Sequence, residues 1–95
     1  MNNDNKLAML KSDLGITATA FDRRLEQYLS KAKSEIEREG ITLADSIDDD
    51  NLQIFYAAWL WRNRDNNSGM PRSLRYMMNN RLLSEKMKAD EEEES

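Results

Sequence analysis

The side chains with the most evident capacity for chemistry lie in two clusters of opposite charge. Three consecutive carboxylates occupy residues 48–50, and four guanidinium groups fall between Arg62 and Arg75. Carboxylate oxygens are the ligands that Ca²⁺ and Mg²⁺ prefer. Guanidinium groups bind carboxylates and phosphates, often through two parallel hydrogen bonds. The sequence therefore raises two kinds of chemistry, cation binding and anion recognition.

The carboxylate cluster does not fit a calcium-binding loop. Leu52 stands where an EF-hand loop needs an oxygen ligand, and the required glycine is missing. Acidic residues are favourable at the start of a helix, because they meet the positive end of the helix dipole. We therefore interpret residues 48–50 as a helix N-terminus, and we expect neither a metal ion nor another cofactor.

Catalysis is disfavoured by the residue types that the sequence lacks. It contains no histidine and no cysteine. Their absence removes the commonest general base, thiolate metal ligands and disulfide bonds. No pair of carboxylates or lysines is placed for acid–base work. We expect that the protein is not an enzyme.

The arginine cluster has two candidate partners, and the distribution of charge bears on both. Residues 1–51 carry seven basic and eleven acidic side chains, residues 62–88 carry seven basic and two acidic, and residues 90–94 are all acidic. DNA-binding domains are usually basic overall, whereas this chain has a net charge of −4. We expect the arginines to meet carboxylates of residues 35–50 in a neighbouring copy. Phosphate contact, in a small DNA-binding accessory protein, is the alternative.

The element that must position the first arginines is an apolar helix that begins near residue 52. Apolar residues mark two of its faces: Leu52, Phe55, Tyr56 and Trp59 on one, and Ile54, Ala58 and Trp61 on the other. A helix that is apolar on two faces must be covered on both, so this is the expected central helix. Trp59 and Trp61 point about 200° apart around it. Core packing is therefore favoured over a platform for stacking bases.

Two helices are expected before the central one. Residues 6–14 form a short amphipathic helix, which Gly15 ends in a left-handed conformation. Residues 19–39 form the clearest amphipathic helix of the chain, with Thr19 and Asp22 as a variant capping box at its start. Gly40 ends this helix, and residues 41–47 connect it to the central one.

A fourth helix begins at Pro71, after a turn over residues 65–69. Its apolar seam consists of Leu74, Met78 and Leu82, and Met77 and Arg81 flank that seam as a docking edge. Beyond residue 89 no apolar side chain follows, which is typical of a disordered segment. The sequence thus predicts an all-α, four-helix bundle-like domain over residues 1–88 and a disordered acidic tail over residues 89–95.

Several stretches of the chain resemble the head-tail connector proteins of tailed bacteriophages, also called head-completion or adaptor proteins. They are Leu10–Ile16, Asp22–Ile36, Tyr56–Arg64, Gly69–Arg75 and Asn79–Leu82. Together they cover most of the chain, and the last three are the most specific. The acidic tail is not part of the family's pattern.

The resemblance implies a structural virion protein, made in the host cytoplasm and placed at the head–tail junction. It implies a homo-oligomeric ring of about a dozen copies beneath the portal protein. Such a ring extends the DNA channel and docks tail or stopper proteins. Genomic DNA would pass through it without sequence-specific binding. No membrane is involved, since no apolar run approaches the roughly 20 residues of a membrane span.

On this interpretation, contacts with other subunits or with the portal fall around the turn at residues 65–69 and along the last helix. The expected interface residues are Trp61, Arg62, Arg64, Met70, Pro71, Arg72, Arg75, Met77 and Arg81. Besides the DNA-binding alternative, a regulatory protein that acts by mimicry through its acidic tail stays open. Deleting residues 90–95 would abolish the function of such a protein.

Overall fold

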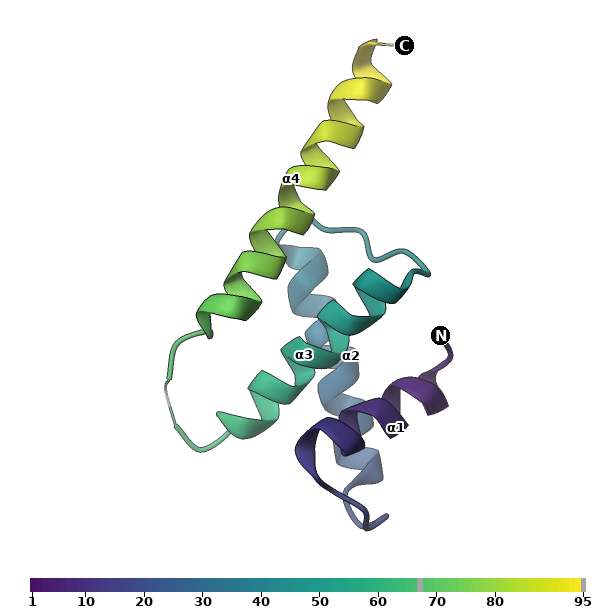
Figure 1. The fold of residues 1–95 in the computed structure, drawn as a ribbon, viewed down its shortest axis with the longest axis vertical. Helices are drawn as coiled ribbons and strands as arrows, with labels where there is room; N and C mark the ends of the chain where they lie inside the picture. Colours follow the sequence, from purple (N-terminus) through teal and green to yellow (C-terminus); the bar gives the residue numbers. More distant parts are fainter. Residues whose placement is uncertain (67, 95) are drawn as a thin grey trace.

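The computed structural model describes residues 1–66 and 68–94 of the chain, and the side chains of these residues up to Ala89. Its four helices are α1 (Asn3–Leu14), α2 (Asp22–Arg38), α3 (Ile47–Arg62) and α4 (Arg72–Glu94) (Figure 1). The described residues contain no strand. The prediction of an all-α fold with four helices is confirmed. None of these helices is both long enough and apolar enough to span a bilayer.

Helix α3 lies at the centre of the molecule and packs against the other three helices (Figure 1). Leu52, Ile54 and Ala57 are at most 2% exposed, as expected of a helix that is apolar on two faces. The cover is nevertheless incomplete, because Phe55 on the same helix remains 41% exposed. The expectation that both faces of this helix are covered is wrong at that position.

The ends of α1 and α3 follow from residues close to each end. The side chain of Asn2 accepts a hydrogen bond from the Asn5 N–H at 2.8 Å, and Gly15 ends α1 with φ +71°. Ser46 caps α3, because its hydroxyl accepts from the Asp49 N–H at 3.2 Å. The three aspartates fill the first turn of α3, as predicted.

The start of α2 differs from the prediction. Helix α2 begins at Asp22, and Phe21 at the cap position makes no side-chain hydrogen bond, so the capping box at Thr19 is wrong. The Asp22 carboxylate instead lies 2.7 Å from the Lys11 ammonium group of α1. A contact with a neighbouring helix replaces the local cap. At the other end, Gly40 adopts φ +108° and stops the helix as expected.

The inner faces of α2 and α3 form most of the core. Leu25, Ala32 and Ile36 of α2 are fully buried. Gln53 of α3 is also buried, and its amide is satisfied: it donates to the Leu29 carbonyl at 2.9 Å and accepts from the Lys6 ammonium group at 2.8 Å. A buried polar group costs little once it is paired in this way.

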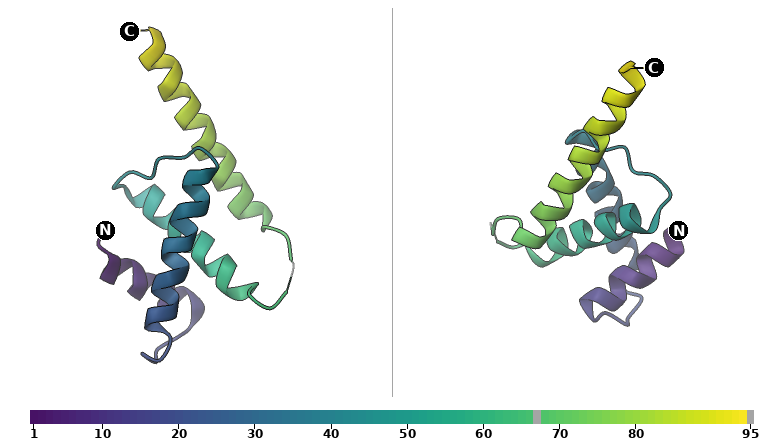
Figure 2. Two further views of the ribbon diagram at one scale, coloured as in Figure 1. Left: turned by 180° about the vertical axis from the view of Figure 1, so that it is seen from behind. Right: turned by 45° about the horizontal axis from the view of Figure 1, so that its top comes forward.

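Helix α4 rests on the body along only part of its length. Leu74 and Met78 are buried and Leu82 is half-buried, which confirms the predicted seam. Beyond residue 85 no described side chain is buried, and the helix projects away from the body in every view (Figures 1 and 2). The radius of gyration, 14.4 Å, accordingly exceeds the about 12 Å of a compact domain of this length.

The C-terminal residues also depart from expectation. Helix α4 continues through Glu94, so the predicted disordered tail is not confirmed. Ser95 lies outside the described residues. The acidic run therefore extends a helix that has already left the body of the molecule.

Candidate subunit interface

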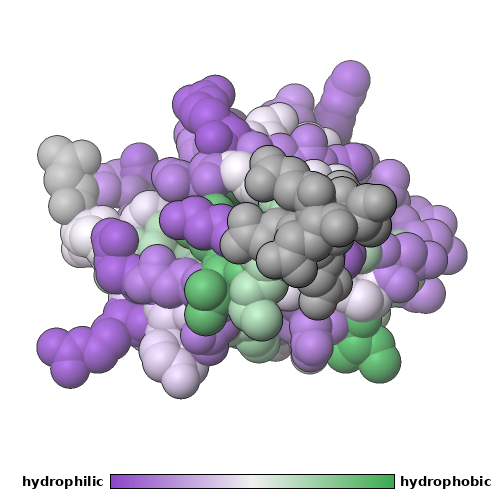
Figure 3. Space-filling view, turned by 90° about the horizontal axis from the view of Figure 1, so that it is seen from above, coloured by the Kyte–Doolittle hydropathy of each residue, from purple (hydrophilic) through white to green (hydrophobic). Residues whose placement is uncertain are grey.

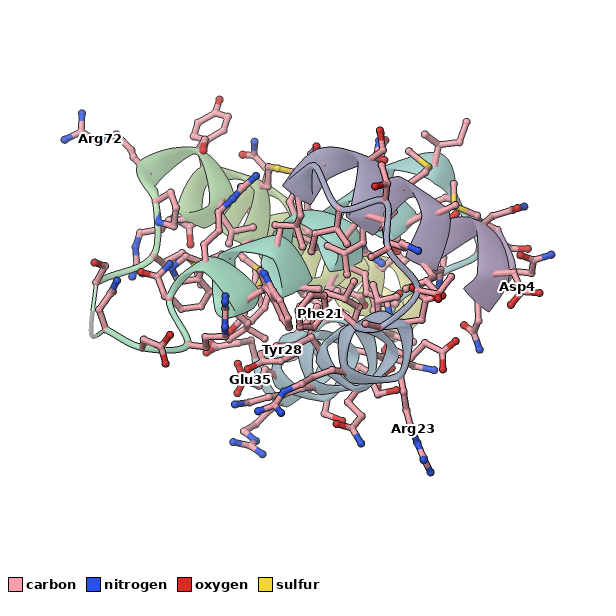
Figure 4. The ribbon with its side chains drawn as sticks, turned by 90° about the horizontal axis from the view of Figure 1, so that it is seen from below. Asp4, Phe21, Arg23, Tyr28, Glu35 and Arg72 are labelled. Carbon is pink, nitrogen blue, oxygen red and sulfur yellow. The ribbon has the colours of Figure 1, made fainter. Side chains whose placement is uncertain are left out.

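Trp61, an expected interface residue, lies in the core. Its side chain is 8% exposed. The rings of Phe21 and Tyr28 pack edge-on against it, with centroids 5.6 Å and 5.5 Å away. Edge-to-face pairs of this kind stabilise the packing beyond the area they bury. Trp61 thus joins α2 to α3 within one subunit, and in Figure 4 Phe21 and Tyr28 lie on the side of α2 that faces α3.

The two arginines that follow Trp61 make contacts within the subunit. The Arg64 guanidinium lies 4.1 Å from the centroid of the Trp61 ring, a cation–π contact, and it donates to the Trp61 carbonyl. Arg62 donates to the Asp13 carbonyl at 3.0 Å. That carbonyl belongs to the last turn of α1, where helical carbonyls lack partners in their own helix. Both side chains remain exposed at their outer surface.

Arg81 is the most fully engaged arginine of the set. Its Nε lies 2.7 Å from Asp49 Oδ1, and its Nη2 donates to the Thr42 carbonyl at 2.8 Å and lies 2.8 Å from Glu85. This one guanidinium ties α4 to the start of α3 and to the connection before it. The contacts of Arg81 therefore hold α4 against the rest of its own subunit.

The pKa of Asp49 depends on its contact with Arg81. Burial alone would raise the pKa of its carboxyl group. The hydrogen bonds from Arg81 and from the Ala44 N–H oppose burial and hold the pKa of Asp49 below its usual value. The Thr42 N–H and Arg81 likewise lower the pKa of Glu85. Both carboxylates are thus charged partners of the α4 attachment.

Two of the three aspartates at the start of α3 have partners in the same chain. Asp50 lies 3.7 Å from the Lys6 ammonium group, and Asp49 is bound by Arg81. No group of three or more possible metal ligands occurs in the described residues. The interpretation of these carboxylates as the first turn of a helix agrees with this arrangement.

Arg72 and Arg75 are the free cations of the set. Both are exposed at the start of α4, and neither makes an ion pair with another described residue. Arg72 points away from the molecule in Figure 4. Pro71 just before them is exposed, and Met70 is half-buried against the core. The beginning of α4 therefore presents two guanidinium groups to any partner with carboxylates or phosphates.

A groove runs along the outer side of α3 beside α4. Its larger part, about 410 Å³, is floored by Leu52, Phe55 and Met77 and bordered by Asp48. A smaller part, about 200 Å³, shares Phe55 and ends near Arg62 and Pro71. Met77, an expected interface residue, lines this groove. The groove is therefore apolar in the middle and has both charge signs at each end, Asp48 with Arg81 at one and Asp13 with Arg62 at the other.

The comparisons with known proteins can be set beside this geometry. A sequence model of the phage gp6-like head-tail connector proteins matches residues 4–93. No curated protein sequence and no solved structure matches the chain. The matched range includes α2, α3 and all but one residue each of α1 and α4. The chain belongs to the phage head-tail connector family. It is therefore a structural component of the virion.

The connector has a further exposed surface that the expected interface residues did not include. Tyr76, Leu83 and Met87 of α4 are 68%, 58% and 58% exposed. Their spacing of seven and four residues places them on one face of the helix, opposite the buried seam. The sequence shows this spacing. The structure is needed to show that this face of α4 points outward, because it lies opposite the buried seam.

Proposed function

We propose that the connector assembles as a ring beneath the portal, where it continues the DNA channel and docks tail or stopper proteins. Membership of the connector family supports this role. The observation that best supports a ring is the pair of exposed guanidinium groups without an ion pair among the described residues, Arg72 and Arg75. The first half of the same chain, residues 1–51, is acidic. When one patch of a subunit contacts a different patch on the next copy, the repeated contact forms a closed ring if the rotations between neighbours add up to a full turn.

The acidic half supplies exposed partners for such contacts. Glu37, Glu39 and Asp48 are exposed and carry no ion pair among the described residues. An arginine–carboxylate contact at the edge of an interface contributes orientation and association rate more than affinity. The apolar surface around Phe55 and along α4 would contribute the area that such edge contacts cannot.

The test is the solution mass of the protein by light scattering, over a concentration series at low and high salt and with purified portal added. We expect a discrete species of about a dozen subunits, free or bound to the portal, that weakens as salt screens the charge contacts. A monomer under all of these conditions would contradict the ring.

The variant Arg72→Glu/Arg75→Glu examines the arginines directly. We expect it to lose assembly with its helix content unchanged, since neither side chain contributes a described contact to the fold. Arg23→Glu/Arg24→Glu on α2 is the matched control: both residues are exposed and the change in charge is the same. Normal assembly of the first variant would remove the arginines from the interface.

Phosphate binding by the same arginines is supported less well. Arg62 and Arg64 are engaged within the subunit, which leaves two free guanidinium groups rather than four. DNA affinity that falls steeply with rising salt would support the DNA-binding alternative. Absence of binding at low salt would exclude it.

A further inference from the structure

Helix α4 carries a second row of side chains on the face that points away from the body. Tyr76, Leu83 and Met87 are each more than half exposed, and Asn80 between them is exposed as well. The steps from Tyr76 to Met87 are four, three and four residues, which is the spacing of a and d positions in a coiled coil. We call these four residues the outer seam. Their spacing is suited to packing against another helix.

The outer seam is not used within its own subunit. Leu74 and Met78 of the buried seam pack into the core, and Arg81 is bound to Asp49. These contacts hold the opposite side of α4 against the body, so the outer seam is directed away from it. Seen from above, apolar surface gathers near the centre of the molecule and at one edge, among hydrophilic side chains (Figure 3). The outer seam is therefore open to another chain.

The charged side chains beside the outer seam are basic. Helical geometry places Arg72 and Lys86 along one flank of the seam, and both side chains are exposed. Glu85 is the one acidic residue of α4 before Asp90. It is turned inward, where its carboxylate accepts a hydrogen bond from the Thr42 N–H at 3.1 Å. A helix that carries carboxylates beside its own apolar row would complement this basic flank.

A second copy of the chain offers no matching helix other than α4. Among the described residues outside α4, the large exposed apolar side chains are scattered. Met9 is the one such residue of α1, α2 has none, and Ile47 and Phe55 of α3 are eight residues apart. Over the length of the outer seam, pairing α4 with another α4 would give Lys86 no carboxylate. These observations favour a helix from a different protein.

We propose that the outer seam binds an amphipathic helix of a different protein, in which carboxylates flank the apolar row. The two helices pack at a small crossing angle, about 20°, over the roughly 16 Å from Tyr76 to Met87. Asn80, the one amide in the seam, favours a single register at some cost in affinity. This inference rests on the proposed docking of tail or stopper proteins, and it names the surface that receives them. It does not require the ring, because the outer seam is complete in one subunit.

A designed peptide tests the outer seam on the purified wild-type chain. The probe is a fluorescently labelled helix of three heptads, with leucine at the a and d positions and glutamate at the e and g positions. Repulsion between the glutamates disfavours pairing of the peptide with itself. We expect fluorescence anisotropy to show binding about tenfold tighter than that of a matched peptide with lysine in place of glutamate. Equal affinity for the two peptides, or no binding of the glutamate peptide, would overturn the proposal.

Two pairs of variants locate the bound peptide. We expect Leu83→Ala to weaken binding about tenfold, and Met9→Ala on α1 to leave it unchanged. Lys86→Glu should remove the preference for the glutamate peptide. Lys88→Glu, which makes the same change in charge farther around the helix from the outer seam, should keep that preference. Helix content should be the same in all four variants. Unchanged binding by Leu83→Ala, or equal effects of the two lysine variants, would place the peptide elsewhere.

Other occupants of the outer seam would give different results. A wild-type dimer that is lost in Leu83→Ala would assign the seam to a second copy. Binding of duplex DNA, or of vesicles of anionic lipid, that Leu83→Ala abolishes would assign it to those surfaces. Each of these results would overturn the proposal. Failure of the proposed ring appears separately, as a protein that stays monomeric with portal present and still binds the glutamate peptide.

Discussion

Arg72 and Arg81 have the same charge and lie on the same helix, yet their surroundings give them different roles. Arg72 is exposed and has no described ion pair, whereas Arg81 binds Asp49, Thr42 and Glu85. The difference follows from the face of α4 on which each residue falls. Arg81 flanks the buried seam, and Arg72 lies on the outer side.

Replacing Arg81 with alanine should destabilise the fold. Asp49 is 4% exposed, and removing its partner leaves a buried charge uncompensated, at a cost of roughly 3 kcal/mol. We expect a correspondingly lower urea midpoint with an unchanged slope. Arg72→Ala is the control and should stay within about 0.5 kcal/mol of the wild type. Equal stabilities of the two variants would show that the Arg81 contacts contribute nothing.

The stability of the subunit should fall in acid through the same ion pair. The pKa of Asp49 is lower in the folded chain than in the unfolded chain, so its contribution is complete above the unfolded pKa and is lost as the pH falls through the folded one. We expect the urea midpoint to decrease as the pH is lowered below about 4. Asp49→Asn should show a shallower decrease over that range, although it is less stable at neutral pH. A parallel decrease in both proteins would exclude Asp49 as a source of the acid sensitivity.

The residues that were predicted well are those whose role depends on near neighbours in the chain. Gly15 ends a helix because of its own backbone freedom, and residues 48–50 start one because of the helix dipole. The pairing of Asp49 with Arg81 joins residues 32 positions apart and has no local signal. For the same reason, the sequence pattern marked Arg62, Arg64 and Arg81 as interface candidates, without showing that each has a partner in its own subunit.

At the scale of elements, α3 is the helix on which the other three depend. It shares the aromatic cluster of Trp61, Phe21 and Tyr28 with α2, and it carries α4 on its outer side. The two-sided apolar pattern predicted its central position correctly. It did not show that α4 leaves Phe55 uncovered, because that depends on the angle at which α4 crosses α3.

Trp61→Ala should therefore act as a core substitution. Removing a buried aromatic ring leaves a cavity and typically costs about 3–5 kcal/mol. We expect a large loss in the free energy of unfolding and a reduced near-UV circular dichroism signal. Tyr76→Ala is the matched aromatic control, since Tyr76 is 68% exposed, and it should leave stability nearly unchanged. A Trp61→Ala protein as stable as the control would place Trp61 outside the core.

At the scale of the whole molecule, the subunit is a small three-helix body with a long helix that extends beyond it (Figure 2). The molecule measures 50 × 30 × 18 Å along its principal axes. Its shape separates the basic start of α4 from the acidic end. Family membership makes this shape part of a connector.

Backbone hydrogen exchange should reveal this division. We expect amides of α3 to open only with the whole body, whereas those of residues 86–89 in α4, whose side chains are exposed, should exchange with solvent much faster in an isolated subunit. In the assembled form we expect the same α4 amides to become protected. Protection that is identical in the two forms would mean that this end of α4 gains no cover on assembly.

The loosely held end of α4 has a consequence for the accuracy of assembly. Ordering a weakly packed segment on binding costs conformational entropy, so each contact made through it is weaker than its area implies. A subunit held by a single contact of this kind dissociates readily. In a closed ring such as the one proposed, every subunit contacts two neighbours. If the proposed ring forms, misplaced subunits would thereby be released before closure, and correctly placed ones would be retained after it.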